Sequence, residues 1–351
     1  MTQPRCFFVI PGNINTLTGG YGYDRRLLAG LRARGLDITH LALPAGFPAP
    51  DTHARAAAAS LLSSLPDSSV VVVDGLAFGV LDAEMAPHAT RLRFIALCHH
   101  PLALETGISA ADSERMHLQE QGALAHSRAI VVTSPETQRI LCEQFGQQRE
   151  HITVAVPGTD RHGFAACTGD PPLLLSVATL TRRKAHDVLI GALSALRDLP
   201  WQARFVGGGE FDPAWAAHLK ALVVQHGLQQ RITFVGALQD LREEYQQADL
   251  FVLPSLFEGY GMVFAEALAT GLPIVAASAG AVPGVVPASA GILVEPGSID
   301  ALQSALQRVL INAALRRELQ QGARTAAAIL PTWEAAARTV HEVIIKVSRQ
   351  A

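Results

Sequence analysis

Two carboxylates lie eight positions apart beside a glycine-rich turn in residues 254–266. Glu258 directly precedes Gly259 and Gly261, and Glu266 lies on the stretch that should continue as a helix. Glycines let the backbone approach a ligand, and the amides at a helix start favour an anion such as a diphosphate. One carboxylate can then reach a sugar while the other meets a ribose of the same ligand. Local physics leaves a second interpretation open, in which one acid caps the helix and the other is solvated.

A run of three cations, Arg182, Arg183 and Lys184, follows the hydrophobic stretch 173–177. The run falls where a helix should begin, and cations oppose the helix dipole at that end at a cost of about a few tenths of a kcal/mol each. We therefore expect a negative group opposite them, and a diphosphate is the candidate. The alternative is a solvated run whose side chains project into water.

Two histidines and a carboxylate, His99, His100 and Glu105, follow the predicted strand 94–98. Strand ends in parallel sheets face the ligand cleft, so we expect these groups to meet a sugar or an acceptor. Consecutive strand residues point to opposite faces, which argues against one metal ion shared by both histidines. A packed histidine is the other alternative. His99 is the first candidate for the sugar and His100 the second, and Glu105 is a candidate for acceptor binding.

Composition limits the class of protein. The chain has 351 residues, too many for one ordinary core, so we expect two domains. Hydrophobic residues make up 49% of the chain and charged residues 17%, which excludes global disorder. The net charge of −3 lacks the basic excess that nucleic-acid binding requires. The four cysteines are too far apart for a metal-ligand pair or a dense disulfide framework, which indicates reduced thiols in a cytoplasmic chain.

Short β-branched runs alternate with longer Ala- and Leu-rich stretches, and this alternation occurs twice. It is typical of βαβ units on parallel sheets. The predicted strands are residues 7–10, 38–43, 70–73, 94–98, 130–133, 152–156, 173–177, 203–206, 232–235, 250–253, 274–276 and 292–294. The predicted helices include residues 24–34, 109–125, 185–196, 214–226, 240–247, 263–270 and a segment from 299 onward. The sequence therefore predicts an α/β fold of two doubly wound domains facing a central cleft.

One segment, residues 267–294, carries no formal charge over 28 positions and is long enough to resemble a membrane span. Four glycines and three prolines divide it into pieces too short to cross a bilayer as a helix. We therefore expect strands and loops here. Residues 167–172 contain a glycine and paired prolines, which continue neither a helix nor a central strand, and this segment is the expected linker.

The window 254–266 and its continuation to residue 275 resemble the Glu-x7-Glu signature of retaining glycosyltransferases of family 4, within glycosyltransferases group 1. These enzymes have the GT-B fold. Four other stretches are similar to motifs of that family: Gly19-Gly20, residues 157–160, residues 205–209 with Gly208, and residues 245–255. Together these motifs are far more specific than a lone glycine pattern.

The resemblance implies a division of the chain into domains. Residues 1–166 would form a Rossmann-like acceptor-binding domain, and residues 173–331 a Rossmann-like domain that binds the nucleotide sugar. Residues 332–351 would form a final helix that crosses back to the first domain.

The resemblance also implies roles for single residues. Glu266 would bind the ribose hydroxyls, Glu258 the hexose, and Lys184 the diphosphate. The family's glycine-arginine pair would fall at residues 178–179, where this chain has Ala-Thr, so Arg182 or Arg183 would substitute. The donor-binding backbone would comprise Gly19, Gly20, Gly208, Tyr260, Gly261, Met262 and Val263.

The implied activity is transfer of a hexose from a UDP- or GDP-linked sugar, with retention at the anomeric carbon, to a sugar, lipid-linked or small-molecule acceptor. His99, Lys184 and Glu258 would be the catalytic residues, and no metal or other cofactor is expected. The protein would be cytoplasmic, with peripheral contact at the inner membrane face if the acceptor is a lipid. Alternatives are a GT-B sugar phosphorylase, a nucleotide-sugar epimerase, or a nucleotide-sugar-binding protein without transferase activity.

Overall fold

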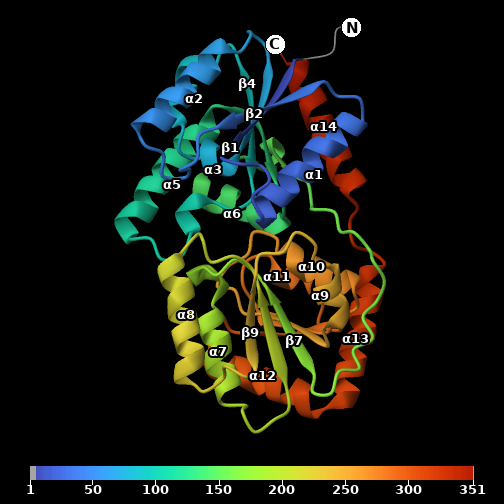
Figure 1. The fold of residues 1–351 in the computed structure, drawn as a ribbon. Coiled ribbons are helices and arrows are strands. Elements are labelled where there is room, and N and C mark those ends of the chain that lie inside the picture. The colour runs from blue at the N-terminus through green and yellow to red at the C-terminus, as the bar shows by residue number, and fades with distance from the viewer. Residues whose placement is uncertain (1–4, 351) are drawn as a thin grey trace. The chain divides into compact units, whose positions relative to one another are not determined.

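The computed structural model describes residues 5–350, so residues 1–4 and 351, at the ends of the expected domains, lie outside the described residues. The chain divides into two compact units (Figure 1). The first unit contains the chain up to Gly158 and again from Pro331, and the second unit runs from Thr159 to Leu330. Residues 167–172, the linker that the sequence suggested, lie inside the second unit.

The first unit has a six-stranded parallel sheet in the order β2-β1-β3-β4-β5-β6. Its strands are β1 (Cys6–Pro11), β2 (Ile38–Leu43), β3 (Val70–Asp74), β4 (Arg93–Cys98), β5 (Ser127–Val132) and β6 (Ile152–Val154). Its α-helices are α1 (Gly19–Ala33), α2 (Thr52–Ser64), α3 (Gly75–Phe78), α4 (Asp82–Met85), α5 (Ala110–Ala125), α6 (Pro135–Phe145) and α14 (Trp333–Ser348), and its 3-10 turns are η1 (Ala86–His88), η2 (Leu102–Leu104) and η3 (Arg149–His151).

The second unit has its own six-stranded parallel sheet, in the order β12-β11-β10-β7-β8-β9. Its strands are β7 (Leu173–Val177), β8 (Gln202–Val206), β9 (Ile232–Gly236), β10 (Leu250–Leu253), β11 (Ile274–Ala277) and β12 (Gly291–Val294). Its α-helices are α7 (His186–Ser194), α8 (Pro213–Gln225), α9 (Arg242–Gln247), α10 (Met262–Ala269), α11 (Val282–Val285), α12 (Ile299–Ile311) and α13 (Ala313–Ala327), and its 3-10 turn is η4 (Arg182–Lys184).

Both sheets contain a point where the strand order reverses. In the first unit the reversal lies between β1 and β3, and in the second unit it lies between β7 and β10. Loops that leave neighbouring strands in opposite directions open a crevice at this point, where doubly wound proteins bind their ligands. The fold class is therefore α/β with two doubly wound sheets, as the sequence predicted.

The final helix α14 belongs to the first unit and packs against α1 (Figure 1). The two helices approach closely at Gly30, where a Cβ atom would lie 2.6 Å from that of Ala337. Trp333, at the start of α14, contacts the Tyr23 ring with a centroid separation of 5.8 Å. These contacts anchor the last segment of the chain to the first sheet's helical layer.

The start of α1 differs from the sequence-based expectation. A helix was predicted from residue 24 and a loop at Gly19-Gly20, but α1 begins at Gly19. The Thr18 side chain accepts a hydrogen bond from the amide of Tyr21 and so caps the helix five residues earlier than expected. The prediction was wrong because the hydrophobic pattern begins only after the first helical turn.

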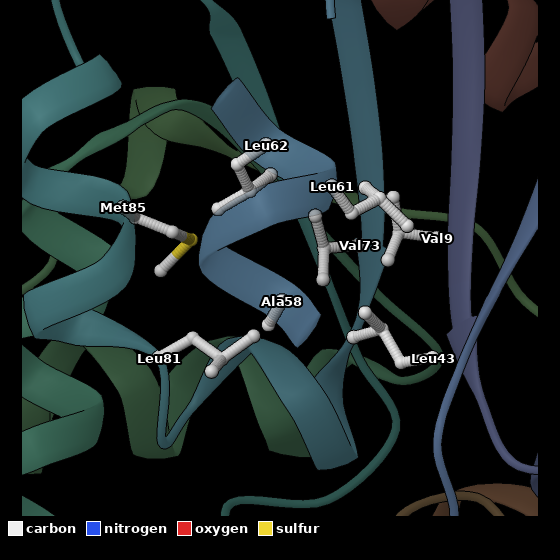
Figure 2. Close-up of a pocket in the computed structure, with 8 residues that line it drawn as sticks. All are labelled: Val9, Leu43, Ala58, Leu61, Leu62, Val73, Leu81 and Met85. Carbon is white, nitrogen blue, oxygen red and sulfur yellow. The ribbon is translucent and has the colours of Figure 1, made fainter. Parts of the chain in front are cut away.

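A small apolar cavity of about 10 Å³ lies between the first sheet and α2 and α4 (Figure 2). It is lined by Val9, Leu43, Ala58, Leu61, Leu62, Val73, Leu81 and Met85. A space of this size holds one water molecule at most and is lined without polar partners for it. It is a packing gap in the core and not a ligand site.

Candidate functional site

Glu258 lies in the loop between β10 and α10, at the point where the second sheet reverses its strand order. The residue is only 5% exposed. Its carbonyl oxygen accepts a hydrogen bond from the amide of Ala281 at 2.9 Å, so the loop after β11 supports the loop after β10. Gly280 makes this approach possible, because a Cβ atom there would lie 2.3 Å from the same oxygen.

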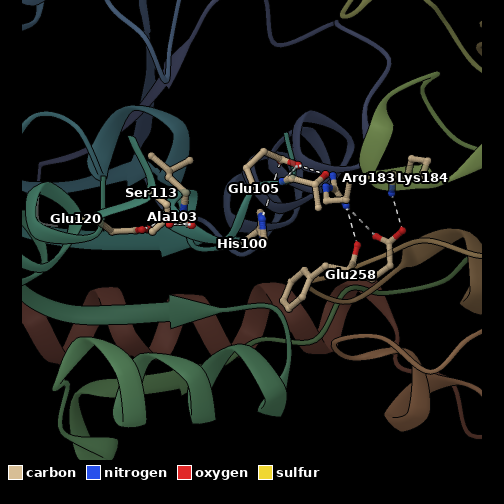
Figure 3. Close-up of polar contacts among 11 residues, drawn as sticks. His100, Ala103, Glu105, Ser113, Glu120, Arg183, Lys184 and Glu258 are labelled. Atoms are coloured by element: carbon tan, nitrogen blue, oxygen red, sulfur yellow. Dashed lines mark hydrogen bonds and ion pairs between the residues drawn. The ribbon is translucent and has the colours of Figure 1, made fainter. Parts of the chain in front are cut away.

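Two of the three consecutive cations meet Glu258 (Figure 3). Lys184 Nζ donates to Glu258 Oε1 at 2.6 Å, and Arg183 Nη1 lies 3.5 Å from Glu258 Oε2. Arg183 also donates to the carbonyl of Phe257 at 3.0 Å. Burial would raise the pKa of Glu258, but Lys184 and Arg183 outweigh it and hold that pKa below its usual value. The result is an ionised cluster of one buried carboxylate and two partly buried cations.

The third cation lies apart from this cluster. Arg182 stacks over the ring of Trp215 at 4.4 Å, and its Nε lies 3.7 Å from Asp212 Oδ2. Its side chain is 55% exposed. The sequence left open whether Arg182 or Arg183 accompanies Lys184. Of the two, Arg183 shares with Lys184 the contact to Glu258.

The expected helix over the cations begins later than the sequence suggested. Residues Arg182–Lys184 form the 3-10 turn η4, and Ala185 has a φ of 52°, in the left-handed region. The α-helix α7 starts only at His186. The three cations therefore lie on the turn before the helix, where the backbone can aim Arg183 and Lys184 at the loop after β10.

Glu266, the second acid of the window, is held by a residue that sequence reasoning did not single out. The hydroxyl of Tyr245 donates to Glu266 Oε2 at 2.8 Å. Burial raises the pKa of Glu266, the bond from Tyr245 lowers it, and nearby Asp160 raises it. Tyr245 opens the motif 245–255, but its function as a donor to Glu266 depends on a tertiary contact that this motif does not encode.

The backbone between the two acids has the geometry of a helix start. Gly261 is the N-cap of α10 with a φ of 86°, and a Cβ there would lie 2.6 Å from the Phe264 ring. The amides of Met262 and Val263 begin the helix directly after it, with half-buried Tyr260 just before it. Free amides at such an end attract an anion, so the backbone and the cation cluster favour the same kind of group.

Gly208 lies in the loop after β8, and β8 is the neighbour of β7 in the second sheet. Its carbonyl accepts a hydrogen bond from the amide of Leu180 at 2.8 Å, which ties this loop to the one that leads to the cations. A Cβ at Gly208 would meet the flexible carboxyl end of Glu210. Gly208 thus lies beside the turn of Arg182–Lys184.

In the first unit, His99 lies directly after β4, where the sequence placed it. Its Nε2 lies 3.0 Å from Asp24 Oδ1 and 3.4 Å from Asp74 Oδ2. Sequence reasoning missed both acids. Asp74 is the last residue of the run Val-Val-Val-Val-Asp and so stands at a strand end, a signal that could have identified it, whereas Asp24 lies in the middle of α1.

The side-chain atoms of His99, Asp24 and Asp74 all lie within 4.8 Å of one another, close enough to surround a cation. The distances from Nε2 to the two carboxylates also fit hydrogen bonds from a protonated ring, which needs no ion. His100, which the sequence paired with His99, lies instead near Glu105, with 4.0 Å between Nε2 and Oε2. The two histidines thus face different partners, as the alternation along a strand implied.

Gly19 and Gly20 form the first turn of α1 in this unit. A Cβ at Gly20 would lie 3.6 Å from the His99 ring, and one at Gly19 would meet nothing within 4 Å. Before them, Arg25 holds the loop by donating to the carbonyls of Ile14 and Thr16. The glycines therefore lie beside the His99 group.

The turn after His100 rests on a buried carboxyl (Figure 3). Glu120, on α5, accepts a hydrogen bond from the amide of Leu102 at 2.9 Å and a further one from the backbone of Ala103. Ser113 donates to the carbonyl of Ala103 at 2.7 Å. Burial raises the pKa of Glu120 to about 8. Glu105 follows this turn, and 42% of its side chain is exposed.

A known sequence family covers the second unit. Residues 163–326 match the model of glycosyl transferases group 1. Among curated relatives, the chain is 30% identical over 253 residues to a D-inositol 3-phosphate glycosyltransferase from Xylanimonas cellulosilytica. That match covers 66% of this chain and 60% of the relative. The chain spans less than two thirds of the length of such relatives.

Solved structures share the fold over nearly the whole chain. Sucrose-phosphate synthase from Thermosynechococcus elongatus has a TM-score of 0.80 at 21% identity, and the match covers 97% of this chain and 99% of that one. HepE of Anabaena in complex with UDP-glucose has a TM-score of 0.78 at 15% identity, with coverage of 97% and 99%. The fold of the protein is GT-B. Within residues 5–350, none of the helices has the length and hydropathy needed to cross a membrane.

The buried ion pair gives a first prediction. We expect Lys184→Met to lower the free energy of unfolding by about 3–5 kcal/mol, because it leaves Glu258 charged and buried without its main partner. The double variant with Glu258→Gln should recover much of that loss. Denaturant titration of the single and double variants measures it, with Asp240→Asn in the exposed Arg242–Asp240 pair as a control that should change little. A loss in the double variant equal to the sum of the losses in Lys184→Met and Glu258→Gln would contradict this coupling.

The buried carboxyl of Glu120 gives a second prediction. Its folded-state pKa of about 8 lies above the ordinary value of 4.5, so the folded protein keeps a proton that the unfolded chain releases. The stability from this group is present at low pH and is lost as pH rises from 4.5 to 8, with a slope of about 1.4 kcal/mol per pH unit. Glu120→Gln should remove that slope from unfolding free energies measured across this range. Glu114→Gln, on the exposed face of α5, is the control and should keep the wild-type slope.

Proposed function

We propose that the protein is a retaining glycosyltransferase of family 4 that transfers a hexose from a UDP- or GDP-linked sugar. The acceptor would be a sugar, a lipid-linked molecule or a small molecule. The observation that carries the proposal is the cluster of Lys184, Arg183 and Glu258 at the reversal point of the second sheet, beside the glycine-capped start of α10. A cationic turn that faces a helix start suits a diphosphate.

The transferase chemistry needs two kinds of charge stabilisation. Breaking the bond between sugar and phosphate places negative charge on the departing diphosphate and positive charge on the sugar ring. Lys184, Arg183 and the amides of Met262 and Val263 would stabilise the leaving diphosphate. Lys184 now donates to Glu258, and a bound diphosphate would share that ammonium group. Glu258 would then orient the hexose through its hydroxyls.

The nucleotide end of the donor would lie at Glu266. Its carboxylate can accept hydrogen bonds from the two ribose hydroxyls while Tyr245 holds Oε2. Gly208 would border the same pocket, because its loop adjoins the turn that carries Lys184. This assignment uses both acids of the Glu-x7-Glu spacing for one ligand.

The first unit would bind the acceptor and would also contact the donor sugar. We assign the sugar contact to His99, with Gly19 and Gly20 beside it, and acceptor binding to His100 and Glu105. Transfer with retention would proceed by attack of the acceptor hydroxyl on the face that the diphosphate leaves. The charged groups of the protein would take the leaving charge in place of a divalent metal.

Similar proteins support this assignment. The solved structure of Anabaena HepE, with a TM-score of 0.78, holds UDP-glucose, and sucrose-phosphate synthase and a D-inositol 3-phosphate glycosyltransferase also resemble the chain. We further propose that the protein works in the cytoplasm and contacts the inner membrane face when its acceptor is a lipid.

Nucleotide binding provides the test. A thermal-shift series with UDP, GDP and ADP, each with and without EDTA, should show stabilisation by one nucleotide that EDTA does not alter. Glu266→Gln should weaken that nucleotide's binding by about tenfold or more, because the ribose loses a charged acceptor. Glu318→Gln, an exposed acid on α13, should bind it as the wild type does.

Two results would contradict the proposal. One is the absence of stabilisation by any nucleotide or nucleotide sugar, and the other is binding that depends on a divalent metal. If binding holds, product analysis by proton NMR with the matching nucleotide sugar should show the donor's anomeric configuration in the product. An inverted product would reject the retaining mechanism while leaving the donor site in place.

A further inference from the structure

Two buried acids enclose one edge of the His99 imidazole. Asp24 is fully buried and Asp74 is 2% exposed, whereas 21% of the His99 side chain is exposed. Both carboxylates approach the same ring nitrogen, Nε2, at 3.0 and 3.4 Å. One edge of the ring is therefore fixed inside the unit, while part of the His99 side chain remains exposed.

Each acid is held in place by contacts of its own. Asp74 accepts a hydrogen bond from the amide of Leu76 at 3.0 Å and so caps α3. Gly75 fits against β4 so closely that a Cβ there would lie 2.9 Å from the carbonyl oxygen of Leu97. Asp74 is thus fixed relative to the strand that carries His99.

Asp24 is held by the helix α1, which Thr18 caps at its start and which α14 covers. The neighbouring Tyr23 touches the His99 ring edge-on, with 5.1 Å between the ring centroids. Its hydroxyl donates to the carbonyl of Ala155 at 2.9 Å, which fixes the Tyr23 ring in turn. The imidazole therefore has little freedom to turn away from the two carboxylates.

The charges around His99 favour a proton on the ring. Burial opposes protonation, but Asp24 and Asp74 together raise the pKa of His99 well above its usual value. Burial and the charge of Asp74 also raise the pKa of Asp24. Tyr21 and Tyr23 face the same group. Burial raises the pKa of both phenols, with the charges of Asp74 and Asp24 adding to it at Tyr21 and that of Asp24 at Tyr23, so both stay neutral near pH 7.

We propose that Asp24 and Asp74 are positioning residues that hold His99 as an imidazolium by accepting the hydrogen bond from its Nε2–H, which leaves Nδ1–H as a fixed donor for the substrate. This inference rests on the proposed function and deepens it, because it states what His99 offers to a nucleotide sugar. A neutral histidine with Nε2–H bound would present Nδ1 as an acceptor. An imidazolium presents a positively charged donor, which suits a sugar hydroxyl or a phosphate oxygen.

The first test observes the ring directly. In protein labelled with 15N and 13C at histidine, the His99 signals, assigned with His99→Gln, should be those of a doubly protonated ring at pH 8. In Asp24→Asn the same ring should become neutral at that pH, because the amide keeps the shape and loses the charge. Asp82→Asn removes the partner of His126, which lies 2.8 Å from Asp82, and should leave the His99 signals unchanged.

The second test measures turnover with the nucleotide sugar that the protein binds. Asp24→Asn should lower kcat by about tenfold or more and change the donor KM less than about threefold, because the donor is still bound but His99 no longer carries its charge. The pH at which kcat falls on the alkaline side should move down by about one unit or more. Asp82→Asn should match the wild type in both measurements.

The outcomes separate this inference from the proposed function. A neutral His99 ring in the wild type at pH 7, or an Asp24→Asn protein whose His99 signals and kinetics match those of Asp82→Asn, would overturn the inference. If Asp24→Asn does not fold, the wild-type spectrum and Asp74→Asn decide by the same criteria. A third outcome is that the protein turns over no nucleotide sugar, while its His99 ring is protonated and becomes neutral in Asp24→Asn. In that case the proposed function fails and the positioning of His99 stands.

Discussion

The second unit depends on one physical constraint, the burial of charge at the carboxyl end of a parallel sheet. Glu258 is buried beside Lys184 and Arg183, and each charge is acceptable there only because the others are present. The loops after β7, β10 and β11 must therefore keep their relative positions, and close backbone contacts such as that of Gly280 maintain them. Because of this constraint, the cations and the free amides at the start of α10 favour an anion in the same region. An anionic ligand would be stabilised most there.

The first unit also buries charge at this end of its sheet, but there the acids outnumber the cation. There Asp74 at the end of β3, His99 after β4 and Asp24 within α1 meet near the reversal point of the sheet. A cationic cluster suits a departing diphosphate, and a protonated histidine with a fixed orientation suits a hydroxyl of the sugar. On this account the two units supply complementary parts of one reaction, with charge preorganised in each before any ligand binds.

Much of the fold follows from the sequence because parallel strands are buried on both faces and appear as short apolar runs, as Val70–Asp74 and Leu250–Leu253 do. The acids of the window 254–266 and the cations at 182–184 could also be identified, since glycines and charges cluster there. What could not be predicted depends on contacts between distant segments. Asp24 reaches His99 from the middle of a helix, Tyr245 on α9 reaches Glu266 on α10, and Arg182 and Arg183 differ only in which way the η4 turn aims them.

The central claim is that the second unit binds a nucleotide sugar along the line from Lys184 to Glu266. A crystal structure of the protein with the nucleotide diphosphate that stabilises it tests this claim most directly. The account predicts that the diphosphate oxygens contact Lys184, Arg183 and the amides at the start of α10, and that the ribose hydroxyls contact Glu266. A nucleotide bound at another place, with Lys184 still paired to Glu258 and the start of α10 without a ligand, would contradict it.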